Sequence, residues 1–243
     1  MAVTRLPRAM LIDMDDTILS AYGRPEIAWN HVASEFADEL APLPPPMVAA
    51  AVLAFARSFW STAEPAWRLK LGEARRVTVQ GGFDALAAAG QARLPNDLAI
   101  RIADRFTEYR EQEMFIFPGA HDAIDALRTL GVKLALVTNG AADTQRAKVE
   151  RFELAHRFDH IQIEGEHGFG KPEERAYLHA MDALGVNAGD TWMIGDNLEW
   201  EIAAPQRLGI YAIWMDVHGD GLPPGSPVKP DRIIRSLAEL LPK

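Results

Sequence analysis

Side chains that suit cation binding follow the short apolar run at residues 9–12. Asp13 and Asp15 come directly after that run, and Asp16 and Thr17 complete an acidic turn. Carboxylates crowded at the end of a buried strand repel one another and lose hydration unless a cation, donors or a shared proton compensates. The segment therefore indicates a metal site, although an aspartate-rich turn without chemistry has the same sequence.

Three further polar segments lie close to the ends of predicted elements. They are Thr138-Asn139-Gly140, Gly170-Lys171-Pro172 and Gly195-Asp196-Asn197. Each alone is typical of an ordinary turn or a solvated loop. In a parallel sheet, however, ligands bind beyond the carboxyl ends of the strands. The order of the four segments, at predicted strand ends, therefore favours one shared site.

Short apolar runs alternate with amphipathic stretches over much of the chain, which is typical of parallel strands connected by helices. The expected strands are Ala9–Ile12, Lys133–Thr138, His160–Ile163, Thr191–Ile194, Ile210–Met215 and, with a weaker pattern, Arg232–Ile234. Helical spacing marks Ala120–Leu130 and Pro172–Leu184. We predict an α/β fold whose core is a doubly wound, Rossmann-like parallel sheet covered on both faces.

A helical insertion interrupts this alternation after the first strand. Strand-like runs are absent from residues 19–115, where apolar residues recur at helical spacing. One such face carries Trp29, Val32, Phe36 and Leu40. We predict four or five helices in a cap domain at 19–115, inserted into a core domain formed by 1–18 and 116–243.

Proline and asparagine residues indicate the boundaries within the insertion. Pro42–Pro46 must break any helix, so a new helix is expected to begin near Met47. Asn96, followed by Asp97, has the side chain of an N-cap. Phe117-Pro118-Gly119 marks the expected return to the sheet domain.

The four polar segments resemble the motifs of the haloacid dehalogenase superfamily, specifically its phosphatase branch with a helical cap after the first motif. LIDMDDTIL resembles the first motif, VTNG the second, GKP the third and MIGDNLEWEI the fourth. The resemblance spans nearly the whole chain. It implies a Mg²⁺-dependent phosphatase that hydrolyses a small phosphorylated metabolite.

The resemblance implies catalytic roles for three residues. Asp13 would attack phosphorus and form an aspartyl-phosphate intermediate, which water then hydrolyses. Asp15 would protonate the leaving oxygen as a general acid and later accept a proton from the attacking water. Lys171 would balance the negative charge of the nucleophile and of the phosphate.

Further residues would bind the phosphate and the metal. The Thr138 hydroxyl, with the backbone amides of Asn139 and Gly140 at the start of a helix, would bind phosphoryl oxygens. The implied Mg²⁺ ligands are Asp13, Asp196 and the backbone carbonyl of Asp15, since this ion prefers oxygen donors.

The chain departs from the family pattern at Glu201, where a second aspartate is usual. Because its carboxylate reaches further, we expect Glu201 to orient a metal-bound water or Lys171. Asp16 stands where the family often has glycine, and we expect it to point to solvent without a catalytic role. Thr17 is expected to brace the loop by hydrogen bonding.

Other reactions within the superfamily stay open from the sequence. Phosphomutases use the same acid–base residue, so the motifs do not exclude them. Dehalogenases usually lack the second aspartate, because halide departure leaves no alkoxide to protonate, and Asp15 therefore favours phosphate chemistry. Phosphonate cleavage needs a Schiff-base lysine from the cap, where Lys70 is the sole lysine.

Two non-enzymatic classes were also compatible with parts of the pattern. Phospho-receiver domains join an acidic pair to a later threonine and lysine in a doubly wound sheet, but they are single domains of about 120 residues. The helical insertion and the GDN segment disfavour that class. A catalytically silent binding protein is disfavoured because every acid and the lysine of the mechanism are present.

Composition excludes several other classes of function. The 243 residues carry a net charge of -9, which argues against sequence-independent binding to nucleic acid or to an anionic membrane. Cysteine is absent, so no disulfide, thiolate nucleophile or cysteine-ligated metal is expected. No apolar run reaches membrane-spanning length, and a cytoplasmic location is expected. The sequence makes no prediction of oligomeric state.

Substrate choice is expected to lie in the cap, which would close over the phosphate site. Its tryptophans and basic residues could line a pocket, namely Trp29, Trp60, Trp67, Arg68, Lys70, Arg75 and Arg76. Aromatic residues at helical spacing ordinarily bury against neighbouring helices, so core packing is favoured. Sugar phosphates, nucleotides and phosphoglycolate all remain open as substrates.

Overall fold

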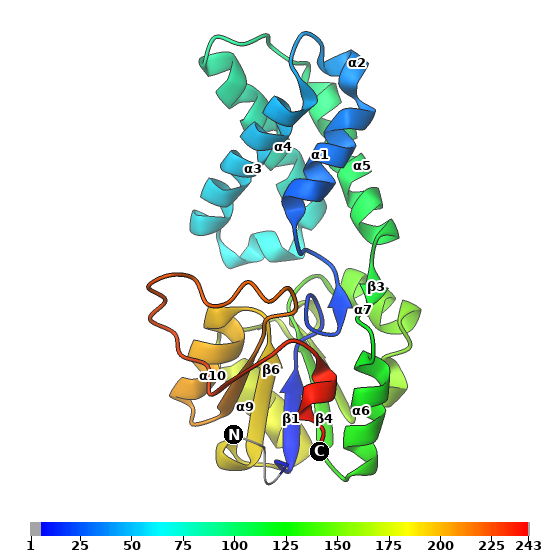
Figure 1. The fold of residues 1–243 in the computed structure, drawn as a ribbon, viewed down its shortest axis with the longest axis vertical. Coiled ribbons are helices and arrows are strands. Elements are labelled where there is room, and N and C mark those ends of the chain that lie inside the picture. Colours follow the sequence, from blue (N-terminus) through cyan, green and yellow to red (C-terminus); the bar gives the residue numbers. More distant parts are fainter. Residues whose placement is uncertain (1–5, 243) are drawn as a thin grey trace. The chain divides into compact units, whose positions relative to one another are not determined.

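The computed structural model describes residues 6–242, which fall into two compact units. One unit joins Met1–Ser20 to Phe115–Lys243 and contains the sheet; the other is the helical segment Ala21–Met114. Figure 1 shows both units, coloured along the chain. Among residues 6–242, no helix combines the length and apolar character that crossing a lipid bilayer requires.

The first unit is built on a six-stranded parallel sheet in the order β5-β4-β1-β6-β7-β8. Its strands are β1 (Ala9–Ile12), β4 (Lys133–Thr138), β5 (His160–Ile163), β6 (Thr191–Gly195), β7 (Tyr211–Met215) and β8 (Arg232–Ile234). Every predicted strand is present, with shifts of one residue at Gly195 and Tyr211. The predicted α/β fold with a doubly wound parallel sheet is confirmed.

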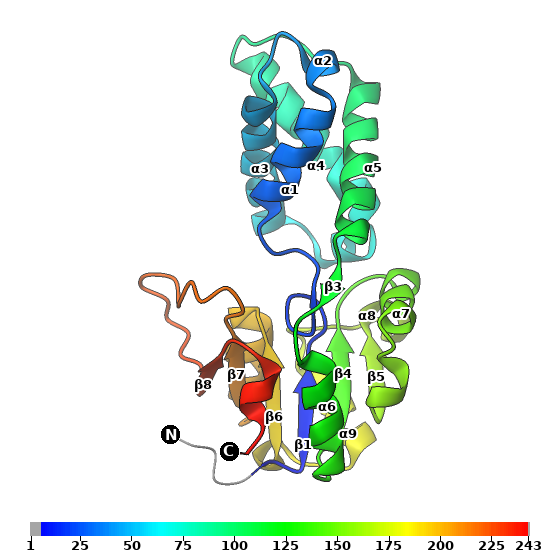
Figure 2. The ribbon, with the colours of Figure 1, turned by 45° about the vertical axis from the view of Figure 1, so that its right-hand side comes forward.

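Helices cover both faces of this sheet, as the apolar character of both faces of β1 requires. The longer ones are α6 (Ala120–Thr129), α7 (Ala142–Arg151) and α9 (Glu174–Leu184), and the shorter ones α8 (Glu164–His167) and α10 (Ala204–Arg207). Short 3₁₀ or π turns are η2 (Ala155–Arg157), η3 (Ala188–Asp190), η4 (Leu198–Ala203) and η5 (Leu237–Leu240). Helix α9 buries Tyr177 and Leu184 against β1 and β4, while α6 and η5 lie on the opposite face (Figure 2).

The register of the sheet brings the carboxyl ends of three strands to one edge. Ile12, the last residue of β1, pairs with Leu136 of β4 and with Ile194 of β6. One residue further on, the Asp13 N–H donates to the Ile194 carbonyl at 3.0 Å. The polar residues that follow these strands therefore start from adjacent positions.

The second unit, Ala21–Met114, is described throughout and consists of helices. They are α1 (Pro25–Glu35), α2 (Ala37–Leu40), α3 (Pro45–Thr62), the 3₁₀ turn η1 (Pro65–Leu69), α4 (Leu71–Ala88) and α5 (Asn96–Gln112). Trp29 lies in their common core and stacks on Phe106 with ring centroids 3.6 Å apart. A Cβ on Gly82 would lie 2.8 Å from the Val52 Cα, so this glycine allows α3 and α4 to pack closely. Core packing of Trp29, which the sequence favoured, is what the structure has.

Two boundaries in this unit differ from expectation. Phe36, with φ -103°, separates α1 from the short α2, so the predicted continuous face ending at Leu40 spans two helices. Asn96 is the first residue of α5 and not its N-cap, which is Pro95 with φ -69° and ψ 146°. Proline fixes φ near this value and has no N–H to satisfy, so it suits the position before a helix. The N-cap prediction for Asn96 was wrong.

Two short antiparallel strands stand where the chain leaves and re-enters the sheet unit. In β2 (Leu19–Ser20) and β3 (Phe115–Ile116), Leu19 pairs with Ile116 and Ser20 with Phe115. The Phe117 N–H also donates to the Ile18 carbonyl at 2.9 Å. The return to the sheet unit therefore begins at Phe115.

Candidate active site

Polar side chains from three neighbouring strands start from one edge of the sheet. Asp13 follows β1, Thr138 ends β4, and Asp196 follows β6. Asp13 and Thr138 are buried, and Asp196 is half-buried. Because the three strands are adjacent and parallel, their carboxyl ends form one surface.

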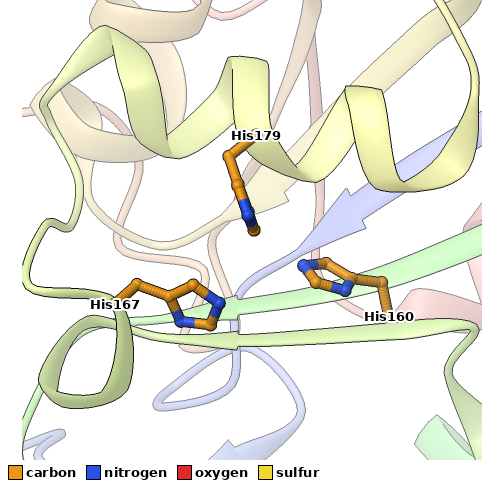
Figure 3. A group of neighbouring side chains, drawn as sticks. All are labelled: His160, His167 and His179. Atoms are coloured by element: carbon orange, nitrogen blue, oxygen red, sulfur yellow. The ribbon is translucent and has the colours of Figure 1, made fainter.

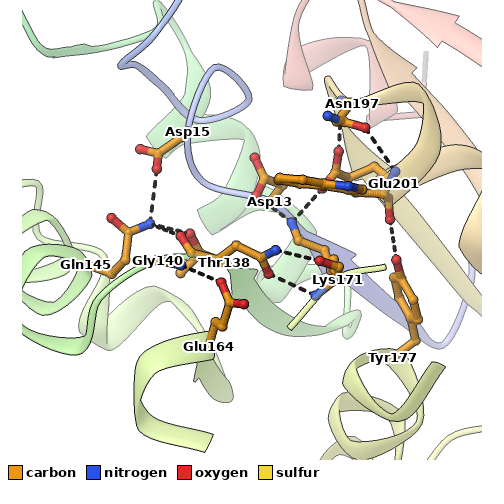
Figure 4. A network of polar contacts seen from close by, with 12 residues as sticks. Asp13, Asp15, Thr138, Gly140, Gln145, Glu164, Lys171, Tyr177, Asn197 and Glu201 are labelled. Carbon is orange, nitrogen blue, oxygen red and sulfur yellow. Dashed lines mark hydrogen bonds and ion pairs between the residues drawn. The ribbon is translucent and has the colours of Figure 1, made fainter. Parts of the chain in front are cut away.

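Lys171 lies at the centre of this group. It is 1% exposed, and its Nζ lies 2.6 Å from Asp13 Oδ1 and 2.7 Å from Glu201 Oε1 (Figure 4). A buried ammonium group is costly unless it is paired, and here two carboxylates pair with it. Of the two partners expected for Glu201, the structure contains the contact with Lys171.

The backbone of Lys171 is held by the second polar segment. Asn139 Nδ2 donates to the Lys171 carbonyl at 2.6 Å, and the Lys171 N–H donates to Asn139 Oδ1 at 2.9 Å. A Cβ on Gly170 would lie 2.6 Å from Asn139 Oδ1, so glycine is required for this close approach. The second and third polar segments thus position each other.

The fourth polar segment, Gly195-Asp196-Asn197, packs against the side chain of Glu201. The Asn197 N–H donates to Glu201 Oε2 at 2.8 Å, and Asn197 Oδ1 accepts from the backbone amides of Glu199 and Trp200 at 3.0 Å. A Cβ on Gly195 would lie 2.0 Å from Glu201 Cγ, which explains why the longer acid at position 201 needs glycine at position 195. Both oxygens of Glu201 therefore have fixed partners.

Asp15 is held by two residues of α7 that the sequence reasoning missed. Lys148 Nζ lies 2.8 Å from both carboxylate oxygens of Asp15, and Gln145 Nε2 donates to Asp15 Oδ2 at 3.0 Å. Gln145 also donates to Thr138 Oγ1 at 2.6 Å. Gln145 and Lys148 are three residues apart, so they project from one side of the helix. That spacing was the available signal, but only the packing of α7 shows which side faces Asp15.

The amide of Gly140 does not have the orientation expected of it. Its N–H donates to Glu164 Oε2 at 3.1 Å, and Glu164 is a buried carboxylate that the sequence reasoning also missed. Helix α7 begins at Ala142, so Asn139 and Gly140 precede its first turn. In this geometry the Gly140 amide already has an acceptor, and its expected role as a phosphate donor is not supported.

The acidic turn differs from expectation at two positions. Thr17 is buried, and its Oγ1 has no hydrogen-bond partner within residues 6–242, so the predicted bracing bond is wrong. Asp16 has a left-handed backbone with φ 58° and is half-buried. After burial and the charges of Glu201 and Asp13, the charge of Asp16 also contributes to raising the pKa of Asp196.

Burial and mutual repulsion dominate the electrostatics of the site. Burial raises the pKa of Asp13, Lys171 opposes that rise, and the charge of Asp15 adds to it. Burial likewise raises the pKa of Asp196 well above its usual range and that of Glu201 to about 7. Burial alone would lower the pKa of Lys171, but the charges of Asp13 and Glu201 raise it instead. These carboxyl groups therefore ionise at a cost that one ammonium group does not cancel.

Comparison with known proteins assigns the family. The sequence model of the haloacid dehalogenase-like hydrolases matches residues 7–209. The chain belongs to this family. The resemblance drawn from the four polar segments is thus confirmed.

Relatives of this hydrolase act on different bonds. A phosphoserine phosphatase from Thermus thermophilus is 35% identical over 159 residues, which are 65% of this chain but only 61% of that phosphatase. The HAD-hydrolase YfnB from Bacillus subtilis, bound to magnesium, has a TM-score of 0.68 at 27% identity over 97% of both chains. A 2-haloacid dehalogenase from Pseudomonas syringae pv. Tomato DC3000 has a TM-score of 0.59 at 25% identity, covering 97% of this chain and 96% of that one. The family alone therefore does not choose between phosphate and halide chemistry.

The residues of this haloacid dehalogenase-like hydrolase fit a divalent cation. When ionised, Asp13, Asp196 and Glu201 carry three negative charges against the single positive charge of Lys171, which leaves an excess of two. Carboxylate oxygens are the donors that Mg²⁺ prefers. Because the pKa values of the three carboxyl groups are raised, cation binding would be linked to proton release.

Proposed function

We propose that this haloacid dehalogenase-like hydrolase is a Mg²⁺-dependent phosphatase that hydrolyses a small phosphorylated metabolite through an aspartyl-phosphate intermediate. The observation that carries the proposal is the buried ion pair of Asp13 with Lys171, with Asp15 two residues away. The similarity to a phosphoserine phosphatase supports it.

Asp13 is the proposed nucleophile. Lys171 is fixed 2.6 Å from its Oδ1 and favours the ionised carboxylate that attack on phosphorus requires. Glu201 and Asn139 hold the side chain and the backbone of Lys171, respectively, so the ammonium group is placed before substrate arrives. Attack forms an acyl phosphate on Asp13 and releases the alcohol; water then cleaves that phosphate.

Asp15 is the proposed acid and base for these two steps. Its protonated carboxyl group would donate a proton to the departing alkoxide, and the resulting carboxylate would take one from the attacking water. Lys148 and Gln145 determine where this carboxylate lies. A halide leaving group needs no proton, so the presence of Asp15 favours phosphate esters over haloacids.

Thr138 is the proposed ligand of a phosphoryl oxygen. Because Gln145 donates to Thr138 Oγ1, the hydroxyl hydrogen of Thr138 stays available for donation to an anion. The Asn139 amide is the proposed second donor. Asp13, Asp196 and the backbone carbonyl of Asp15 would hold Mg²⁺, which when bound screens the repulsion between an anionic nucleophile and an anionic phosphate.

The direct test of the proposal measures phosphate and halide release by the full chain. We expect many phosphates per chain from p-nitrophenyl phosphate in excess Mg²⁺, little release in EDTA, and recovery when Mg²⁺ is restored. A panel of phosphorylated metabolites ranked by kcat/KM then identifies the substrate class. Chloride release from 2-chloropropionate at a comparable rate, or a single phosphate bound per chain without turnover, would contradict the proposal.

Asp15→Asn should lower activity according to the leaving group. For an alkyl phosphate, whose alkoxide must be protonated, we expect kcat to fall by about 10²–10⁴-fold. For p-nitrophenyl phosphate the loss should be much smaller, because nitrophenolate leaves without a proton. The exposed Asp143→Asn, at the start of α7, is the matched control and should retain both activities. Equal losses with both substrates would show that Asp15 is not the acid.

A further inference from the structure

Three histidines of the sheet unit form a second cluster of ligand-type side chains (Figure 3). His160 begins β5, His167 ends α8, and His179 lies in α9. Each offers a ring nitrogen, and these nitrogens lie within 4.8 Å of one another. The cluster shares no residue with the site around Asp13.

A buried glutamine fixes the orientation of His179. His179 Nδ1 lies 2.8 Å from Gln162 Oε1, and Gln162 Nε2 donates to the Ala176 carbonyl at 2.9 Å. The amide oxygen of Gln162 therefore faces the imidazole and can only accept. Nδ1 of His179 must carry the hydrogen, which leaves the lone pair on Nε2.

The other two imidazoles also have a nitrogen available to a cation. His167 Nδ1 lies 3.1 Å from the Ile163 carbonyl, so it carries a hydrogen as well and the lone pair is on Nε2. His160 Nε2 is buried and has no hydrogen-bond partner in the described part of the chain. A buried ring nitrogen without a partner loses its hydrogen bonds to water and gains none from the protein, which costs free energy.

The surroundings of His160 favour its neutral form. Burial lowers the pKa of His160, and positive charge on His179 or His167 lowers it further. The charged neighbours are already paired: Arg175 with Glu173 at 2.9 Å, and Arg146 with Glu166 at 2.6 Å. Neutral imidazole is the form that binds metals.

We propose that His160, His167 and His179 form a binding site for a divalent transition-metal ion, with Zn²⁺ as the best-suited ion. Three imidazole ligands with an open fourth position are a recurrent zinc arrangement. His179 is exposed, so an ion and a water reach this side of the cluster from solvent. Mg²⁺ prefers oxygen ligands and does not compete for imidazoles.

Metal binding requires only a small adjustment of the rings. Tetrahedral Zn²⁺ with Zn–N bonds of about 2.0–2.1 Å separates its ligand nitrogens by about 3.4 Å. The widest spacing here, up to 4.8 Å, must therefore close by up to about 1.4 Å, which rotation of the imidazoles would supply. The hydrogen bonds of His167 and His179 are made by Nδ1, so the Nε2 atoms can approach one ion without breaking them.

The site would link the two helices that flank the loop carrying Lys171. That loop runs from α8, which ends at His167, to α9, which contains His179. A metal bound to both histidines and to β5 would constrain the loop in the folded chain only. We therefore expect Zn²⁺ to raise the thermal unfolding temperature of the protein.

Calorimetric titration of the full chain with Zn²⁺, in excess Mg²⁺ so that carboxylate sites are occupied, tests the proposal. We expect one Zn²⁺ to bind tightly per chain and to raise Tm. When Co²⁺ is bound in place of Zn²⁺, we expect a visible absorption spectrum typical of cobalt with few ligands. The double variant His167→Ala/His179→Ala should lose the spectrum and the Tm rise, with at least about tenfold weaker binding. The exposed His218→Ala, after β7, should behave as wild type.

His179→Gln provides a milder variant in case the double variant folds poorly, because His179 is exposed and glutamine stays polar. Circular dichroism without metal checks the fold of each variant. Absence of Zn²⁺ binding by the wild-type chain would overturn the proposal. So would unchanged affinity and Tm response in His179→Gln and in the double variant, which would place the ion elsewhere.

Discussion

Asp13→Asn should reduce phosphate release to the uncatalysed background, a loss of at least about four orders of magnitude in kcat. Asparagine keeps the size of the side chain but removes the negative charge that attacks phosphorus. It also leaves Lys171 with one carboxylate partner, Glu201, in place of two. The measurement is phosphate release under saturating Mg²⁺ by protein whose folding has been verified by its thermal transition.

The matched control for this variant is Asp182→Asn, an exposed position on α9. It makes the same change of charge in the same unit without touching the site, and it should keep near-native turnover. Near-native activity of Asp13→Asn would remove the nucleophile from the proposed mechanism, whatever the other variants did.

Lys171→Met should cost both activity and stability. Methionine has a comparable volume, but it leaves Asp13 and Glu201 buried beside each other without their ammonium partner. Breaking a buried pair in this way typically costs about 3–5 kcal/mol in the free energy of unfolding. We expect kcat to fall by about 10²–10³-fold, as when a preorganised charge-stabilising group is removed.

The stability loss of Lys171→Met should depend on pH. The pKa of Glu201 is already raised to about 7 with the lysine present, and removal of the lysine raises it further. A protonated Glu201 needs no cation, so the destabilisation should be small at pH 5. It should grow as the pH rises through 7 and reach its full size only above the higher pKa that Glu201 has in the variant. Urea unfolding at both pH values, in EDTA, measures the difference.

Lys133→Met serves as the control for both effects. Lys133 Nζ donates to the Leu184 carbonyl at 2.6 Å near the surface and contacts no carboxylate of the site. Its replacement should leave kcat unchanged and show no comparable pH dependence of stability. Equal effects of the two lysine variants would argue against a special role for the buried pair.

The sheet and the strand-end residues could be predicted because they depend on short-range patterns. A strand buried on both faces is a continuous apolar run, and parallel strands bring their carboxyl ends together whatever helices connect them. Asp13, Thr138 and Asp196 were placed correctly at one edge for that reason. The family resemblance added Lys171, whose own surroundings in sequence show only a loop.

The partners of these residues depended on packing that the sequence does not encode locally. Whether Lys148 reaches Asp15 is decided by the rotation of α7 about its axis. Whether Gly140 offers its amide to a ligand is decided by Glu164, from a different strand–helix connection. Thr17 was expected to find a hydrogen bond because threonine usually does in loops, yet its hydroxyl is buried without a partner among residues 6–242. The histidine cluster was missed because its members come from three separate elements.

The pairing of Leu19 with Ile116 holds together the two ends of the helical segment Ala21–Met114, so this segment is a closed loop inserted into the sheet unit. Bringing the two ends of a long loop together costs entropy that grows only slowly with its length. Here the hydrogen-bonded pairing of β2 with β3 holds the two ends of the loop together, independently of the helices between them. We therefore expect insertions, deletions or exchange of the intervening helices to leave the geometry of Asp13 and its neighbours intact.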